Sequence, residues 1–500
     1  MTLTPMKLAF LQQLSPLSID LYLAAAFLVI IALDLLAPKA QKQALAWVAV
    51  LLIAGGLVGT WLIDVSGVAL SGAYVGDELG LFFKRLFLAS GLLTGLMAVG
   101  YGAKHWAGRQ IEYFALLMAS LLGMSVLSGV RDLVLLLVAF ELMGIPLYVM
   151  AGYTRDDRKS VEGAFKLLMT GAVSTATSMF GVSLLSGLAG TTSLAGIGAY
   201  AAHHPSGLVA LGGTMAVAGM GFKIGVFPFH MWVPDTYEGT RTPTVTFLAV
   251  APKAAGLLAL TQILFAHDKV LLGVASSMLL ILITATMVMG NVFALQQSNV
   301  KRLLAYSGVG HMGFLLMAML AGAHADIGLA AMMFYLGGYL FTTVGAFAVV
   351  HAVAEAGGDD SIDSFNGLVQ RSGFLGFAML LFLLSLAGIP FVVGFWAKLY
   401  VFMAAWKAGM SSLVVLGAVI SVVGLFYYLR VARAMFMKPA PVGAAPIEPK
   451  GMTTLVLSIC LVFVLGMGMQ PRPFIEAAQD AAAKYMAGKP MVQLAAAEGR

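Results

Sequence analysis

Long uninterrupted runs of apolar residues dominate this chain of 500 residues. A helix of about 20 apolar residues is long enough to cross the hydrocarbon core of a bilayer. The spacing predicts fourteen such segments, at approximately 18–37, 43–63, 80–100, 111–129, 132–152, 161–188, 207–230, 243–266, 270–294, 299–320, 326–354, 372–404, 410–434 and 452–468. Because the connections are mostly short, we expect an all-α polytopic membrane protein with one transmembrane domain over residues 1–500.

Two of these segments, the seventh and the twelfth, are interrupted by helix-breaking residues. The segment at 207–230 contains Pro228, and the segment at 372–404 is too long for one straight crossing and is broken at the sequence AGIP. The two lie five segments apart, so they must cross the membrane in opposite directions. Paired interrupted helices are typical of transporters that are built from inverted repeats. We therefore expect two inverted five-helix repeats, at 111–266 and 270–434.

Composition and charge support a membrane location and suggest an orientation. The chain is 60% hydrophobic and 10% charged, whereas soluble domains carry about 25% charged residues. The net charge of +6 does not indicate nucleic-acid binding, because the basic residues are scattered through short loops. With the N-terminus outside, the inner loops hold fifteen lysines and arginines, while the outer side holds four plus four in the C-terminal tail. Since inner loops collect basic residues, both termini are expected on the outer side.

The sequence argues against several kinds of chemistry in this chain. Its single cysteine, Cys460, excludes a cysteine-ligated iron–sulfur cluster within the chain. There is no phosphate-binding loop of the Gly-x-x-x-x-Gly-Lys-Ser/Thr type, so ATP is not the expected energy source. The histidines are too dispersed for a metal-ligand motif. We expect no cofactor and no metal bound by this chain.

Five of the charged residues in the apolar segments are candidates for a function, because a charge inside the membrane is costly. Glu141 and Lys253 are at the midpoints of their segments, Lys223 is beside the first break, Lys398 follows the second, and Lys166 is near the inner end of its helix. A buried salt bridge that fixes helix packing is one interpretation, but one carboxylate cannot neutralise four lysines. A lysine that is buried without a partner becomes able to titrate near neutral pH. The pattern therefore favours proton carriage.

Two histidines extend this hypothesis, and two other basic residues do not. His230 and His311 could take part in a relay, since imidazole titrates near neutrality, although hydrogen-bonded packing histidines are an alternative. Lys84 and Arg85 lie near the outer end of the third segment, so we expect their side chains to reach the membrane interface. A broken helix exposes backbone groups that are tolerated only in protein or beside a wet cavity. We therefore expect polar pockets next to the lysines.

Five stretches of sequence carry a resemblance to a known family. They are ELMGIPLYVMAGY, GFKIGVFPFHMWVPDTYEGT, TPTVTFLAVAPKAAG, NVKRLLAYSGVGHMGF and LAGIPFVVGFWAKLYVF. In order and spacing, the chain resembles the antiporter-like membrane subunits of proton-pumping NADH-quinone oxidoreductase (respiratory complex I), over essentially its whole length. Among them subunit N is the most similar: subunit L has a long C-terminal lateral helix that is not expected here, and subunit M has a glutamate where this chain has Lys398.

The resemblance implies a role for each buried charge. Glu141 would pair with Lys223, and Lys253 would be the central relay residue. Lys166 would lie near the inner intake route, and Lys398 would pass the proton outward. The chain would then act as a translocase subunit that couples NADH-to-quinone electron transfer in other subunits to proton pumping.

The resemblance also implies partners and a location. NADH, FMN, iron–sulfur clusters and quinone would be bound by partner subunits. The partners would be other membrane subunits of complex I and the lipid bilayer, in a bacterial cytoplasmic (inner) membrane. Three alternatives remain: a subunit of a multisubunit sodium/proton antiporter, a secondary transporter of organic solutes, and a scaffold. A line of lone lysines fits protons better than a solute pocket, and buried charges argue against a scaffold.

Overall fold

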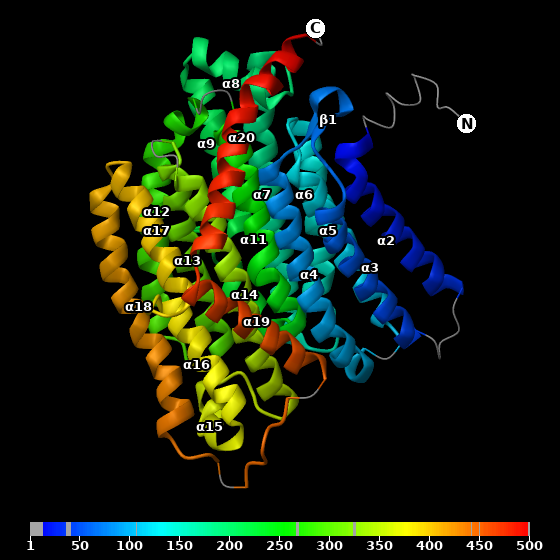
Figure 1. The fold of residues 1–500 in the computed structure, drawn as a ribbon, viewed down its shortest axis with the longest axis vertical. Helices are drawn as coiled ribbons and strands as arrows, with labels where there is room; N and C mark the ends of the chain where they lie inside the picture. The colour runs from blue at the N-terminus through cyan, green and yellow to red at the C-terminus, as the bar shows by residue number, and fades with distance from the viewer. Residues whose placement is uncertain are drawn as a thin grey trace.

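The protein is a bundle of long helices that run mostly side by side along the long axis of the molecule (Figure 1). The computed structural model describes residues 14–36, 42–106, 108–266, 270–323, 327–441, 443–449 and 451–498. Within these ranges, thirteen helices are long and apolar enough to cross a membrane. The predicted class, an all-α polytopic membrane protein, is confirmed.

The elements follow one another in three groups. The first holds η1 (Ser15–Leu17), α2 (Ser18–Leu36), α3 (Lys42–Leu62), β1 (Gly67–Ala69), η3 (Leu70–Gly72), β2 (Tyr74–Gly76) and α4 (Glu78–His105). The second holds α5 (Gln110–Ser128), α6 (Leu133–Ala151), α7 (Arg158–Ala189), α8 (Leu194–His203), α9 (Gly207–Ile224), α10 (Trp232–Gly239) and α11 (Thr242–Leu264). The third holds α12 (Val270–Leu295), α13 (Val300–Ala321), α14 (Ile327–Glu355), η5 (Ile362–Phe365), α15 (Leu368–Arg371), α16 (Gly373–Ala387), α17 (Val393–Lys407), α18 (Ser411–Met437), α19 (Met452–Met469) and α20 (Arg472–Glu498).

Short polar side chains at the ends of the apolar runs set where several helices begin. Asp77 caps α4 by accepting a hydrogen bond from the backbone of Gly80. Asp132 and Asp157 do the same for the first turns of α6 and α7, and Asn299 for α13. A side-chain oxygen at this position satisfies backbone N–H groups that have no partner within the helix. The caps therefore place the helix starts at the edge of each apolar run.

Both predicted interruptions occur, but glycine ends each helix before the proline is reached. α9 ends at Ile224, where Gly225 has a left-handed φ of 76°, and α10 begins after Pro228. α16 ends in the same way before Gly388, with a φ of 86°, and α17 begins after Pro390. Glycine adopts this conformation without steric cost. Within each of the ranges expected to form a repeat, 111–266 and 270–434, the broken element is the fourth transmembrane one.

The C-terminal region forms a helix that the apolar pattern did not predict. α20 packs against α4 and α14, with Ile475, Ala478 and Ala482 buried. Lys484 Nζ forms an ion pair with Glu78 at 2.9 Å. The start of α2 and the far end of α20 lie at the same end of the molecule, the upper end in Figure 1.

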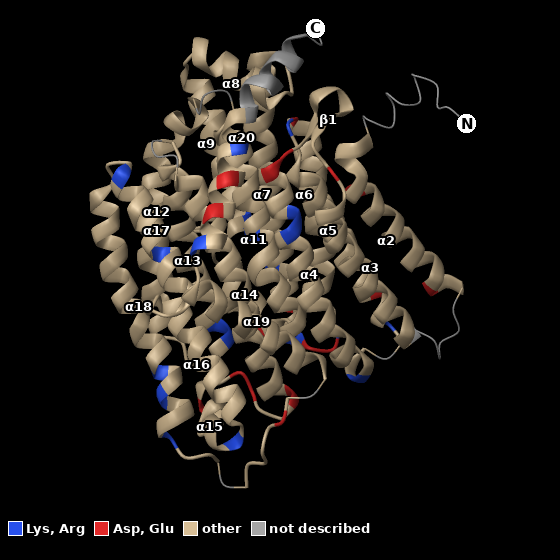
Figure 2. Cartoon of the chain, viewed as in Figure 1, with Lys and Arg blue, Asp and Glu red and all other residues tan. Residues whose placement is uncertain are grey.

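Figure 2 shows charged residues in the connections at the ends of the bundle and also on several helices at mid-height. One buried pair lies among the first helices. Lys84 Nζ donates to Asp20 Oδ2 at 2.7 Å, and its side chain is only 3% exposed. Asp20 also accepts hydrogen bonds from Tyr74 and Ser125. The expectation that Lys84 reaches the membrane interface is therefore wrong, because a carboxylate in the first apolar segment neutralises it.

Candidate functional site: a line of buried lysines

The first pair of charges lies between α6 and α9. Lys223 Nζ is 3.9 Å from Glu141 Oε1, so the two form a loose ion pair. The nearest partner of Lys223 is the hydroxyl of Tyr148, which accepts a hydrogen bond at 2.7 Å. Glu141 accepts a hydrogen bond from Thr175 at 2.5 Å, and its side chain is 35% exposed on the outside of the bundle. Each member of the pair thus has a second polar partner.

Glycines pack closely around the hydroxyl of Tyr148. A Cβ placed on Gly171 would clash with this hydroxyl, and one placed on Gly144 would lie 2.9 Å from Lys223 Nζ. Beside them is a cavity of about 30 Å³ that extends to Pro252 on α11. The volume is that of one or two water molecules, and the walls are almost entirely apolar apart from Lys223, Tyr148 and Thr170. The cavity reaches Pro252, the residue before Lys253, but Lys253 does not line it.

Lys253, on α11, is fully buried at the centre of the bundle with 0% exposure. Its Nζ has no hydrogen-bond partner among the described residues. The ring of Tyr237 lies 5.3 Å away, and a Cβ placed on Gly308 would lie 2.9 Å from both Lys253 Nζ and the hydroxyl of Tyr339. Lys253 and Tyr339 therefore face the same gap beside α13. An ammonium group in this position would lack a carboxylate to neutralise it.

His311, on α13, continues the line beyond Tyr339. The rings of His311 and Tyr339 have centroids 5.3 Å apart. The two ring nitrogens of His311 face hydroxyl groups, with Nδ1 2.6 Å from Tyr335 and Nε2 3.3 Å from Tyr428. Tyr428 in turn contacts the hydroxyl of Ser307. His311 is thus both a packed histidine and a member of a buried network of hydroxyl groups, each of which can donate and accept a proton.

Lys398, on α17, lies beside the second break. Its Nζ donates to the carbonyl oxygen of Ala387, the last residue of α16, at 2.8 Å. The carbonyls at a helix C-terminus have no partner within the helix and carry partial negative charge. The ring of Phe314, one turn beyond His311 on α13, lies 5.3 Å from Lys398 Nζ. The break therefore supplies the polar contact for this lysine, as the sequence predicted.

Lys166 differs from the other three lysines because it has two acidic partners. Its Nζ lies 2.6 Å from Asp235 on α10 and 2.7 Å from Glu162 on its own helix. Asp235 also pairs with Arg302 at 2.6 Å, and Arg302 pairs with Glu238 at 2.9 Å. We call Lys166, Asp235, Glu238 and Arg302 the α10 clamp. It ties the short helix after the first break to α7 and α13.

Electrostatics keep the clamp ionised. Burial by itself raises the pKa of Asp235, but hydrogen bonds from Lys166 and Arg302 outweigh burial and lower this pKa below its usual value. Burial is again opposed at Glu238, where hydrogen bonds from Lys159 and Arg302 lower the pKa. Both carboxylates therefore remain charged at neutral pH.

His230 does not join the line of lysines in this structure. It lies between the two halves of the first broken element, and its closest ring neighbours are Phe227, Phe293 and Tyr306, at 5.3, 5.8 and 6.0 Å between centroids. Its Nδ1 is buried without a hydrogen-bond partner among the described residues. The contacts of His230 are thus aromatic.

The structure pairs Glu141 with Lys223, and it places Lys253 and His311 on either side of Tyr339. Lys398 lies against Phe314, one turn from His311. His230 contacts none of these side chains within the described structure, and Lys166 is held in the α10 clamp. Sequence reasoning missed the tyrosines of the line and the acidic partners of Lys166. The aspartate of the quoted motif WVPD was the available signal for the clamp, but it lies outside the apolar segments. In the part of the chain that the structure describes, no group of three metal-ligating side chains is found.

Comparison with known proteins gives one consistent family. The family described as NADH:quinone oxidoreductase/Mrp antiporter, TM, matches residues 130–424. NADH-quinone oxidoreductase subunit N of Moorella thermoacetica is 38% identical over 94% of this chain and 98% of its own length. NAD(P)H-quinone oxidoreductase subunit 2 of a Synechococcus species is 39% identical over 82% of this chain and 78% of its own.

Solved structures agree with the sequence relatives. A chain of respiratory complex I from Thermus thermophilus is 30% identical, with a TM-score of 0.77, and the likeness covers 92% of this chain and 99% of that one. A chain of the Mrp complex from a Dietzia species has a TM-score of 0.83 over 97% of this chain and 99% of that one, but is only 19% identical. The second likeness concerns the fold alone.

Proposed function

Since the chain belongs to the family of NADH-quinone oxidoreductase subunit N, within the NADH:quinone oxidoreductase/Mrp antiporter membrane proteins, we propose that it carries protons through the membrane in such a complex. The observation that supports this most directly is Lys253, a fully buried lysine whose Nζ has no hydrogen-bond partner within the described structure. A charge at this depth is energetically costly, so a lysine kept there indicates a function. Reversible protonation is the function that a lone lysine can perform.

The relay runs from Glu141 and Lys223 to Lys253, and from there through His311 to Lys398. The water-sized cavity beside Lys223, the gap shared by Lys253 and Tyr339, and the hydroxyl groups around His311 support this order. A change of charge near Glu141 would alter how strongly Lys223 is held. That change would act on the proton carried by Lys253.

Two inverted repeats, at 111–266 and 270–434, would build the relay. The broken fourth element of each repeat, α9 with α10 and α16 with α17, supports this assignment. Each break lies next to a lysine, Lys223 or Lys398. Irregular backbone at membrane depth is found where it is buried in protein or lines a wet cavity.

Electron transfer belongs to partner subunits in this proposal. NADH, FMN, iron–sulfur clusters and quinone would be bound there, and this chain would contact other membrane subunits and lipid in a bacterial cytoplasmic membrane. Both termini would face the outer side. Exposed cysteines test this orientation: His204→Cys should react with an impermeant thiol reagent from outside, and Arg155→Cys only after lysis. The reverse pattern would overturn the orientation, and Cys460, which is buried, should add little background.

A sodium/proton antiporter subunit is the second candidate, and the likeness to the Mrp complex favours it at the level of fold. The two candidates differ in their partners. The chain should be tagged in its native host, extracted in mild detergent and isolated with whatever remains bound. Co-isolation of NADH-dependent quinone reduction supports the proposed function. Isolation with sodium/proton exchange and without quinone reduction would instead support the antiporter.

A further inference from the structure

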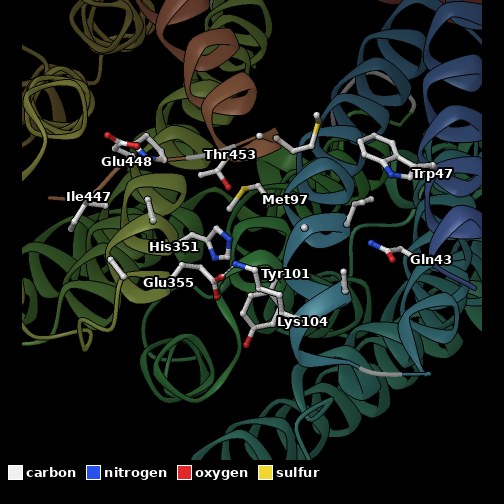
Figure 3. Close-up of a pocket in the computed structure, with 18 of the residues that line it drawn as sticks. Gln43, Trp47, Met97, Tyr101, Lys104, His351, Glu355, Ile447, Glu448 and Thr453 are labelled. Carbon is white, nitrogen blue, oxygen red and sulfur yellow. Dashed lines mark hydrogen bonds and ion pairs between the residues drawn. The ribbon is translucent and has the colours of Figure 1, made fainter. Parts of the chain in front are cut away.

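Two adjoining cavities lie at the end of the bundle opposite the start of α2, and the relay described above does not use them. The larger, about 740 Å³, lies between α3, α4, α14 and residues 446–449 (Figure 3). The smaller, about 410 Å³, extends toward Arg241 and Lys301. Tyr101, His351 and Glu355 line both, so the cavities meet at the last turns of α14. Each is polar in part and far larger than one water molecule.

A buried histidine occupies the junction of the two cavities. His351 is 4% exposed, and its ring lies 5.6 Å from that of Tyr101. Glu355 is one turn further along α14, where Lys104 and His105 contact its carboxylate at 3.2 and 3.0 Å. Figure 3 shows His351 and Glu355 side by side in the lining. An imidazole that borders a cavity can take a proton from cavity water at one ring nitrogen and release one from the other.

A row of side chains on α14 leads from this histidine to the central lysine. His351, Phe347, Thr343 and Tyr339 are each four residues apart, so each lies one turn from the next. The row is about 18 Å long, at 1.5 Å per residue. Thr343 is buried, and its hydroxyl lies close to that of Tyr339. At the end of the row, Tyr339 shares its gap with Lys253.

Phe347 interrupts the polar row but stays in contact with the same centre. Its ring lies 6.0 Å from that of Tyr237, and Tyr237 is the ring next to Lys253 Nζ. The apolar ring of Phe347 therefore separates the cavities beside His351 from Lys253. Lys166, by contrast, is held by Asp235 and Glu162 in the α10 clamp. An ammonium that two carboxylates hold is poorly suited to pass a proton onward.

We propose that protons reach Lys253 along α14, with His351 as the first buried carrier and Thr343 and Tyr339 as the following steps. This inference rests on the proposed function and assigns its intake route. The imidazole of His351 takes a proton from cavity water and releases it, through water and the two hydroxyl groups, to the neutral amine of Lys253. The imidazole is neutral again after the transfer, and no bond between heavy atoms forms or breaks. Glu355, whose carboxylate pairs with Lys104 and His105, lies one turn from the ring in the same cavity wall.

The first experiment removes the carrier and replaces it chemically. The complex with His351→Ala, reconstituted in vesicles, should take up protons about 100-fold more slowly, the lower end of the effect of losing a proton-transfer group. Imidazole added on the cavity side should restore much of the uptake, since the cavity is large enough to admit it. His203→Ala, an exposed histidine at the end of α8, is the matched control and should pump normally. Loss without rescue by imidazole would overturn the carrier role.

A second variant keeps the inference testable if His351→Ala fails to assemble. Thr343→Val has nearly the same shape and removes a single hydroxyl whose neighbour is the hydroxyl of Tyr339, so the loss of stability should be small. Proton uptake should fall at least tenfold while the complex stays intact. Normal uptake by Thr343→Val would overturn the α14 route. If Lys253→Met also pumps normally, the proposed function itself fails; if only Lys253→Met stops pumping, the function stands and the intake route is wrong.

Discussion

Replacing Lys253 by methionine separates a proton carrier from a structural charge. Methionine keeps much of the length and apolar stem of lysine but cannot bind a proton. Lys253 is fully buried, and its Nζ has no hydrogen-bond partner among the described residues. Removing a polar group that has no partner leaves no other buried group unsatisfied. We therefore expect Lys253→Met to fold and assemble at least as well as the natural chain.

Although Lys253→Met should assemble normally, we expect it to pump protons much more slowly. A positioned proton-transfer group accelerates its step by about 100- to 10,000-fold, which corresponds to roughly 3–5 kcal/mol of barrier. Proton uptake by vesicles that contain the reconstituted complex should fall by at least the lower figure. The same change at an exposed lysine, Lys407→Met at the end of α17, is the matched control and should leave uptake unchanged.

Arginine at the same position distinguishes a movable proton from a fixed charge. Arginine stays protonated in proteins, so Lys253→Arg keeps the cation and loses the transfer. The larger guanidinium must also fit beside Gly308, where space is already short. Native gels would measure assembly, NADH oxidation would measure turnover, and a pH-sensitive dye would measure uptake. Full pumping by the arginine variant would mean that a fixed charge suffices, and full pumping by the methionine variant would exclude Lys253 from the relay.

Three further outcomes are expected. Tyr148→Phe removes the 2.7 Å partner of Lys223, so the ammonium should move toward Glu141 and uptake should fall several-fold in an intact complex; unchanged uptake would show that the hydroxyl has no positioning role. The double variant Glu141→Ala with Lys223→Ala should assemble better than the worse single variant, because a lone buried charge is the costly state, and native gels decide this. The lowered pKa values of Asp235 and Glu238 mean that the α10 clamp stabilises the fold above about pH 4 and is lost as the pH falls through those values. Thermal denaturation of the detergent-solubilised complex should therefore change little between pH 6 and 8 and drop on acidification; a loss centred near pH 7 would contradict this.

The length of the apolar runs made the membrane helices predictable, because a helix that crosses the bilayer needs about 20 mainly apolar residues. The same criterion could not find α20, where small and charged residues alternate and where burial comes from packing against α4 and α14. The breaks were expected at Pro228 and at the sequence AGIP (387–390). Gly225 ends the first helix before its proline, and Gly388, within AGIP, ends the second. Proline signals that a helix cannot continue, whereas the residue that takes the left-handed conformation decides where it stops.

The buried lysines were visible in the sequence, but their partners were not. Asp235, which pairs with Lys166, lies 69 residues away and outside every apolar segment. Asp20, which pairs with Lys84, lies inside the first apolar segment and was not considered as a partner. The local apolar pattern predicts that a charge is buried, but the partner carboxylate depends on tertiary packing, which the pattern does not give. For the same reason nothing in the sequence distinguished Tyr339 from the other tyrosines of the apolar segments.

The contacts of Lys223, Lys253 and Lys398 suggest how proton transfer between them is controlled. Lys223 has a hydroxyl and a loosely paired carboxylate, and Lys398 has the free carbonyl at the end of α16. Lys253, between them, has only aromatic rings and a tyrosine hydroxyl across a gap. A proton therefore has polar contacts at both ends of the line and few in the middle. Transfer through the middle would then depend on the charge of its neighbours, so a modest change at Glu141 could decide whether Lys253 is occupied.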